Sequence, residues 1–241
     1  MMRRIIILIF ALALLGCVGQ VKIDVNEILK KSEESVLTKN LDANATFEML
    51  CKTPKLTDFT RYDLRIVKIG NTTKIFFLGY EYNTTDKSQA DVHKKMEMAL
   101  KDAWILDRGD VYYVYTPNLL YMKDKVGEYR AAEGLPRCKF IPIITCLDLA
   151  RFFDKAEDPT LEVGDEAYVV SYNLSYPTIS FAEKADVKVW ISKKDHIPFK
   201  AEISAKFDQT EIKMKAEFKS YKTEGVQCNM SLKGLSIVKR Y

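Results

Sequence analysis

Two stretches decide the fold: PFKAEISAKFD (residues 198–208) and EIKMKAEFKSY (residues 211–221). In each, apolar side chains alternate with Lys, Glu and Ser. Successive side chains of a β-strand point to opposite faces of a sheet, so each stretch predicts a strand with one apolar and one polar face. The polar gap between them, Asp208-Gln209-Thr210, has the length of a turn and predicts an antiparallel hairpin.

The same patterning continues outward from this hairpin. It predicts strands at 185–193, 166–176, 119–124, 104–117 (a hairpin turning at Arg108-Gly109), 73–83, 62–70 and 45–51. Three other stretches space their apolar residues three or four positions apart, which is typical of amphipathic helices. These predicted helices span 24–39, 87–102 and 146–158. Asp24 and Asn26 are candidate caps of the first, and Val92, Met96 and Leu100 are expected to share the apolar side of the second.

A large antiparallel sheet with one apolar face needs a second layer to cover that face. The chain has no second set of strands for a sandwich, but it has helices. We therefore predict an α+β fold: a single strongly curved antiparallel sheet (a half-open β-barrel) with two or three helices covering its concave face. Alanines on the inner face either let helices fill the concavity or leave space for an apolar ligand, and the sequence leaves both open.

The N-terminal residues MMRRIIILIFALALLGCVGQ (1–20) determine the expected location. Two arginines precede an apolar run, 5–15, that is too short to span a bilayer, which needs about 20 residues. This is the anatomy of a secretory signal, and it ends in Leu14-Leu15-Gly16-Cys17, which resembles the lipobox of prokaryotic lipoproteins. We predict a signal peptide at 1–16, a lipid anchor on Cys17, a tether at 17–23 and one domain at 24–241 facing the extracytoplasmic side of the cell membrane. The alternative is an ordinary signal peptide with a chance cysteine.

Four cysteines follow the leader: Cys51, Cys138, Cys146 and Cys228. An even number outside the cytoplasm favours disulfides, and four cysteines allow three pairings. The short spacing within CKFIPIITC favours Cys138–Cys146, which leaves Cys51 for Cys228. A metal site is disfavoured, because there is no CxxC motif and the two histidines lie far from any cysteine in the sequence.

Five asparagines begin an Asn-X-Ser/Thr sequon and are candidate glycosylation sites. They are Asn44, Asn71, Asn83, Asn173 and Asn229. A lipobox argues against a eukaryote and frequent sequons argue for N-glycosylation, so the two together favour an archaeal cell-surface protein.

Catalysis and nucleic-acid binding are both disfavoured by the sequence. Two histidines leave little for acid–base chemistry near neutral pH, and no Gly-rich phosphate loop, nucleophile elbow or HExxH motif is present. The acidic residues mostly alternate with lysine on predicted polar strand faces. The net charge of +4 is too small for a nucleic-acid-binding tract. We therefore expect no enzyme, no cofactor, no metal and no nucleic-acid partner.

The stretch ADVKVWISKKDHIPFKAEI (185–203) resembles a pattern of the lipoprotein-carrier superfamily, which includes LolA, LolB, LppX/LprG and the N-terminal domain of RseB-type proteins. In that pattern a strand ends in Trp-Ile-Asp or similar, and a proline opens the next strand after a short turn. Trp190-Ile191-Ser192 and Pro198-Phe199 match it, whereas Asp195-His196 replaces the residue–glycine pair common in the turn.

The resemblance implies a cavity between sheet and helices that takes a lipid or an acylated ligand. Such a ligand suits an apolar tunnel, since each buried methylene contributes about 0.8 kcal/mol. The candidate lining residues are Phe76, Leu78, Tyr80, Tyr113, Trp190, Ile203 and Phe218. The alternative function is an envelope sensor or scaffold that binds a protein partner without lipid transport.

Overall fold

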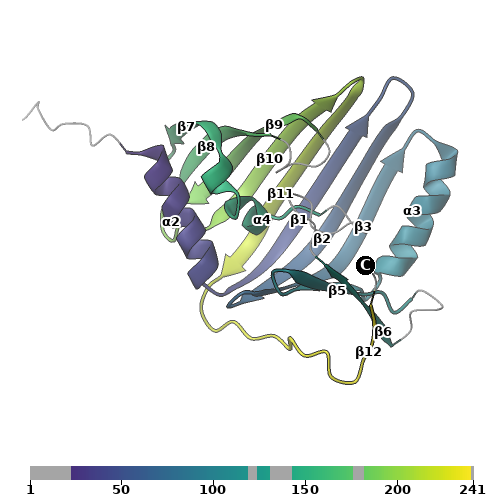
Figure 1. The fold of residues 1–241 in the computed structure, drawn as a ribbon. Helices are drawn as coiled ribbons and strands as arrows, with labels where there is room; N and C mark the ends of the chain where they lie inside the picture. Colours follow the sequence, from purple (N-terminus) through teal and green to yellow (C-terminus); the bar gives the residue numbers. More distant parts are fainter. Residues whose placement is uncertain (1–22, 119–123, 131–142, 176–181, 240–241) are drawn as a thin grey trace, which may run out of the picture.

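The computed structural model describes residues 23–118, 124–130, 143–175 and 182–239. Among these residues, twelve strands form one sheet in the order β12-β6-β5-β4-β3-β2-β1-β11-β10-β9-β8-β7. The sheet is curved and open, and its helices lie on its concave side (Figure 1). The predicted α+β class, a curved antiparallel sheet with a helical cover, is confirmed.

Neighbouring strands are antiparallel except β6 and β12, which are parallel. The strands are β1 (Leu41–Lys52), β2 (Thr57–Ile69), β3 (Thr72–Thr84), β4 (Trp104–Asp107), β5 (Val111–Tyr115), β6 (Lys125–Arg130), β7 (Glu157–Val163), β8 (Ala167–Ser175), β9 (Lys184–Ser192), β10 (Pro198–Phe207), β11 (Thr210–Lys222) and β12 (Ser236–Lys239). The strand predicted at 119–124 falls on residues that are not described, apart from Asp124.

The helices begin at polar side chains that satisfy their free backbone N–H groups. Helix α2 (Val25–Thr38) is capped by Asp24, and α3 (Lys87–Leu100) is capped by Asp86. Helix α4 (Cys146–Ala150) begins with a capping box between Thr145 and Asp148. The N–H groups of the first turn have no acceptor within the helix, and the side chain of each cap accepts a hydrogen bond from one of them.

The helix predicted at 146–158 is wrong beyond its first turns. Helix α4 ends at Ala150, a 3₁₀ turn (η1, Phe153–Lys155) follows, and β7 begins at Glu157. Pro159 excludes a helix through the last residues of this stretch, because proline has no N–H and disfavours helical geometry in the residue before it. The apolar spacing of the stretch was therefore a poor guide to its length.

The last strands have the two faces that their alternation predicts. Ala201 pairs with Ala216 and Ile203 pairs with Met214, and all four side chains are buried on the concave side. Lysines and glutamates of the same strands face the other side. Phe207 departs from the pattern, because it lies at the tip of the β10–β11 hairpin, where 59% of its surface is exposed.

Three helices share the concave side but cover different parts of it. Helix α2 lies at one edge against α4, η1 and β7, and α4 packs on β10. Helix α3 lies at the other side and packs on β3 (Figure 1). The start of α4 also reaches β1 and β2, where Ala45 and Leu64 lie close to Cys146.

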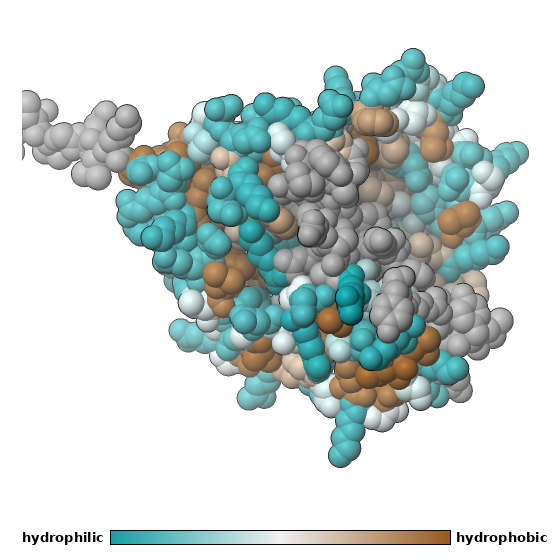
Figure 2. Space-filling model, in the orientation of Figure 1, coloured by the Kyte–Doolittle hydropathy of each residue, from teal (hydrophilic) through white to brown (hydrophobic). Residues whose placement is uncertain are grey.

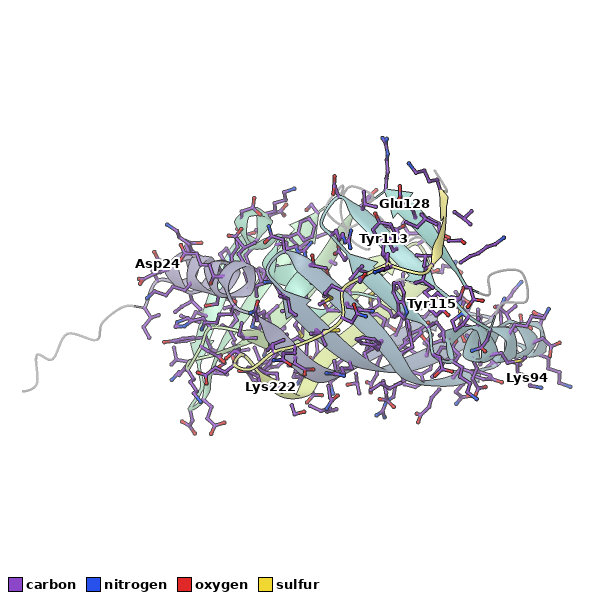
Figure 3. The ribbon with its side chains drawn as sticks, turned by 90° about the horizontal axis from the view of Figure 1, so that it is seen from below. Asp24, Lys94, Tyr113, Tyr115, Glu128 and Lys222 are labelled. Atoms are coloured by element: carbon purple, nitrogen blue, oxygen red, sulfur yellow. The ribbon has the colours of Figure 1, made fainter. Side chains whose placement is uncertain are left out.

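The C-terminal segment covers part of the convex face. After β11 it crosses the sheet and adds β12 beside β6, as the view from below shows (Figure 3). Met230, Leu232 and Leu235 pack there against a second apolar cluster around Trp104 and Leu106. The sequence patterning did not predict this segment, because it contains no long periodic run.

The predicted disulfide between Cys51 and Cys228 is wrong, since both thiols are free. Cys51 lies opposite Asp58 at one end of β2, whereas Cys228 lies near Arg65. Seven residues of strand separate those two positions, which corresponds to about 23 Å. The Cα atoms of a disulfide lie within about 7 Å of each other, so this fold cannot form the bond.

Candidate functional site

An aromatic strip lies on the concave face between α4 and α3. It consists of Phe47 on β1, Tyr62 on β2, and Phe77 and Tyr80 on β3, and Tyr62 contacts the other three rings. The ring centroids are 6.1 Å apart for Phe47–Tyr62, 6.2 Å for Tyr62–Phe77 and 5.0 Å for Tyr62–Tyr80. These separations are typical of attractive aromatic pairs. Phe47, Tyr62 and Phe77 are buried and Tyr80 is half-buried, so the strip is part of the concave core, with hydroxyl groups at one end.

Helix α3 is fastened to that end by a polar contact, the His93 latch, formed by Asp58, His93 and Tyr80. His93 Nε2 lies 2.9 Å from Asp58 Oδ1, and the Tyr80 hydroxyl lies 2.5 Å from His93 Nδ1. An ionised carboxylate can only accept a hydrogen bond, so Nε2 carries a proton and donates to Asp58. With a neutral ring, the Tyr80 hydroxyl then donates to Nδ1. The imidazole also stacks on Tyr82, with centroids 4.7 Å apart.

The apolar spacing of the predicted helix did not identify His93 as an inward-facing residue. It placed Val92 on the apolar side of the helix, but Val92 is 52% exposed while His93 is buried. The spacing of His93, Met96 and Leu100 is also helical and would have given the correct face. The partners of His93 on β2 and β3 explain its burial.

The tyrosines of the strip are hydrogen-bonding groups rather than nucleophiles. Burial raises the pKa of Tyr62 to about 12, and burial is also the main reason why the pKa of Tyr80 is raised. Both phenols therefore stay protonated at neutral pH, which leaves them able to donate to a histidine or to a ligand oxygen.

The space beneath α4 is filled. Between α4 and the sheet, the space bordered by Ala45, Ala216 and Cys146 is too small for a water molecule. The alanines there let the helix approach the sheet closely. Cys146 is buried as a free thiol whose pKa is raised by burial. Its predicted disulfide partner, Cys138, lies outside the described residues.

The seven predicted cavity residues do not lie together. Tyr80, Ile203 and Phe218 are on the concave side, in or against the main core. The other four are not part of that core, and as lining of a cavity under the helices they are wrong. Phe76 and Tyr113 belong to the convex cluster, Trp190 lies under the Lys188 and Lys200 amines, and Leu78 is exposed at a bulge of β3.

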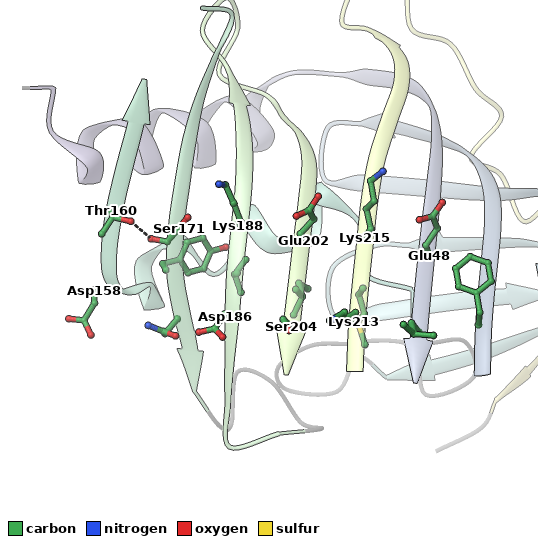
Figure 4. Close-up of a pocket in the computed structure, with 17 residues that line it drawn as sticks. Glu48, Asp158, Thr160, Ser171, Asp186, Lys188, Glu202, Ser204, Lys213 and Lys215 are labelled. Carbon is green, nitrogen blue, oxygen red and sulfur yellow. Dashed lines mark hydrogen bonds between the residues drawn. The ribbon is translucent and has the colours of Figure 1, made fainter. Parts of the chain in front are cut away.

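A groove of about 780 Å³ lies on the opposite, polar face of the sheet, away from α2 and α4 (Figure 4). One row of its side chains crosses the strands as Thr160, Ser171, Lys188, Glu202, Lys215 and Glu48. A second row ends in the apolar residues Leu50 and Phe59. Positive and negative charges alternate along the first row, so neighbouring strands attract one another. The strand alternation predicted this polar face, but not that it is hollowed.

The five sequon asparagines all retain access to solvent. Asn44, Asn71, Asn83 and Asn229 are exposed, and Asn173 is half-buried at the groove. Accessibility is a condition for glycosylation and does not test it, so the five sites stay predictions.

The described residues contain no group of three or more His, Cys, Asp or Glu side chains placed to hold a metal ion. In the same part of the chain, no helix combines the length and the hydropathy needed to cross a membrane.

No protein-family model matches the sequence, and no curated protein sequence matches it. The fold is similar to those of several solved structures. A conserved protein from Thermus thermophilus has 11% identity and a TM-score of 0.48, over 89% of this chain and 98% of that one. A LolA superfamily protein from Nitrosomonas europaea has 15% identity and a TM-score of 0.36, over 85% and 96%. The Pseudomonas aeruginosa MucA/MucB complex has 11% identity and a TM-score of 0.41, over 90% and 64%. The superfamily that residues 185–203 resemble is thus among these structures, while the archaeal origin stays a prediction.

Proposed function

We propose that this chain is an extracytoplasmic, lipid-anchored binding protein that holds the acyl chain of a lipid or acylated ligand against the aromatic strip. It acts by binding and release and does not transform its ligand. The observation that supports the proposal is the position of the strip, in the concave core beside α3, a helix that few buried apolar residues hold in place.

Helices α4 and α3 differ in how much buried apolar surface holds them to the rest of the protein. Helix α4 lies over a filled space and is buried along almost its whole length. Helix α3 buries only His93, Ala99 and Leu100, and its polar residues dominate its surface. Elements with few buried apolar contacts open at low free energy. We infer that α3 is the movable cover and that the ligand reaches the strip when the His93 latch opens.

An acyl chain fits this surface because the binding energy comes from apolar area, at about 0.8 kcal/mol per buried methylene. The strip offers rings for the chain and phenol hydroxyls for an ester or carboxyl oxygen. The anchor on Cys17 keeps the protein at the membrane from which such a ligand comes.

Mass spectrometry of an organic extract tests the proposal. The full chain is purified from membranes, separated from free lipid and extracted, and the extract should contain about one acyl lipid per protein in addition to the lipid bound to Cys17. A fluorescent fatty acid should bind and be displaced by that lipid. An extract without lipid, together with a protein that does not bind the fluorescent fatty acid, would refute it.

A second candidate function rests on the 780 Å³ groove of the polar face. Its alternating charges and its apolar end at Leu50 and Phe59 suit an extended peptide of a protein partner. In that case the extract contains no lipid, and charge reversal at Lys188 or Lys215 weakens partner binding while Lys222→Glu, at the far end of β11, does not.

A further inference from the structure

Two turns meet at one end of the sheet and form a surface that we name the upper rim. They are the β1–β2 turn, residues 52–56, and the β10–β11 hairpin with its flanks, residues 206–213. Lys52 lies opposite Glu211 in the register of β1 and β11, which brings the turns side by side. Both turns line one pocket of about 340 Å³. The upper rim is therefore a continuous surface made by two separate parts of the chain.

The upper rim combines free positive charge with an exposed aromatic ring. Lys52, Lys55 and Lys206 are exposed and form no ion pair with any described residue, while Lys213 pairs with Glu211 at 2.9 Å. The four lysines outnumber the carboxylates, which are Asp208 and Glu211. Phe207 projects beside them, 59% exposed. Figure 2 shows apolar atoms among hydrophilic ones at this end of the molecule.

The chain that leads to Asp24 limits where a membrane can lie. Helix α2 lies along the β7 edge of the sheet, and its first turn is on the upper side of the view, several strands from the upper rim (Figure 1). Seven residues, 17–23, separate the anchor from Asp24, and seven extended residues reach at most about 25 Å. A bilayer that holds the Cys17 lipid therefore lies within about 25 Å of Asp24. The opposite end of α2, at Lys39, donates to Asp195 in the β9–β10 turn, so this turn is farther from the anchor than Asp24 is.

We propose that the upper rim rests on the anionic headgroups of the bilayer that holds the anchor, with Phe207 in the interfacial layer. This inference rests on the anchor in the proposed function. The chemistry is complementary, because anionic lipids attract lysines at the bilayer surface and aromatic rings favour its interface. The contact fixes the orientation of the protein, so that the anchored chain stands on the membrane instead of rotating about its tether.

Lysine footprinting tests the orientation. The full lipidated chain is placed in vesicles of phosphatidylcholine and phosphatidylglycerol, given a short pulse of an acetylating reagent, and digested for mass spectrometry. Lys55 and Lys206 should react severalfold more slowly in vesicles than in detergent micelles. Lys194 is the matched control, since it is an exposed lysine in the β9–β10 turn at the opposite end, and its rate should not change.

Salt and substitution identify the cause. Each lysine near an anionic bilayer strengthens the surface preference roughly fivefold, so Lys206→Glu should remove most of the protection at Lys55, whereas Lys194→Glu should not. High salt should weaken the protection in the parent chain, and Phe207→Ser should lower it. Equal labelling of Lys194 and Lys206 in an anchored chain would overturn the inference and leave the proposed function standing. If mass spectrometry finds no lipid on Cys17 in the N-terminal peptide, both the anchor and the contact between the upper rim and the bilayer are refuted.

Discussion

The hydroxyl groups of Tyr172 and Tyr80 differ in whether they have a hydrogen-bond partner. Both are on the concave side, but the Tyr172 hydroxyl is fully buried without a hydrogen-bond partner among the described residues. The Tyr80 hydroxyl is bonded to His93. A buried polar group without a partner costs free energy, whereas a satisfied one contributes to stability. The same substitution should therefore have opposite effects at the two positions.

Tyr172→Phe is expected to raise the free energy of unfolding by about 1 kcal/mol, because it removes an unsatisfied hydroxyl and keeps the ring that packs on Phe153. Tyr80→Phe is expected to lower it by about 1 kcal/mol, because it leaves His93 Nδ1 without its donor. Urea unfolding of both variants against the parent chain measures the difference. Destabilisation by Tyr172→Phe would show that this hydroxyl has a partner.

Asp42 is predicted to make stability depend on pH. Its two carboxylate oxygens accept from Arg65 Nε and Nη2, both at 3.0 Å, and this pairing holds the pKa of Asp42 below its ordinary value. A carboxyl whose pKa is lower in the folded state stabilises the fold above its unfolded pKa and loses that contribution as the pH falls through the folded value. The stabilising contribution of Asp42 is therefore present at neutral pH and is lost in acidic solution.

Asp42→Asn should lower the free energy of unfolding at neutral pH by about 1 kcal/mol, a modest value because Arg65 is partly exposed. Below pH of about 4 the difference from the parent chain should shrink, since Asp42 is then increasingly protonated. Urea unfolding across this pH range measures it. A difference that stays constant down to the lowest pH would show that the charge is not its cause.

Helix α3 is the element whose motion the proposed function requires. Three buried residues and the His93 latch hold it to β3. His93→Leu removes both polar contacts and leaves Asp58 and Tyr80 without their partner, at a cost of about 1–3 kcal/mol. Amide hydrogens of α3 should then exchange at least tenfold faster, while those of β10 should not change.

Val92→Leu is the matched control, because it puts the same side chain at the neighbouring, exposed position of the helix. It should leave the exchange of α3 as it is. In a protein that binds a fluorescent fatty acid, His93→Leu should also speed its release. Equal exchange in both variants would show that the latch does not hold the helix.

Elements with long periodic patterns could be predicted from the sequence, and elements made by long-range contacts could not. The strict alternation over 198–221 predicted β10 and β11 and the faces of their side chains. Alternation could not show that Phe76 and Tyr113 face the C-terminal segment, because the two faces of a strand are equivalent until both covers are known. Likewise Asp58 and His93 are 35 positions apart, and only the fold brings them together.

For the whole molecule, the patterning predicted the curved sheet and its helical cover but left open whether the concave side is filled. Small residues such as Ala216 were compatible with either outcome, and in the structure Ala216 and Ala45 allow α4 to pack closely. The described groove lies instead on the polar face. Residue size alone cannot distinguish a cavity from a close helix contact, since both use alanine.

The distribution of free thiols gives a prediction about the folded molecule as a unit. Cys51 and Cys228 are partly accessible, whereas Cys146 is completely buried in α4. Thiolates are the reactive form, and burial raises the pKa of Cys146 and keeps reagents away from it.

A brief treatment of the native protein with iodoacetamide, followed by peptide mass spectrometry, should therefore modify Cys51 and Cys228 and spare Cys146. In urea, where the protein is unfolded, all three thiols should react. This control shows that the residues next to Cys146 in the sequence do not themselves prevent its modification. Because the fold holds Cys51 and Cys228 far apart, a peptide that links the two would contradict this arrangement of the sheet and the C-terminal segment.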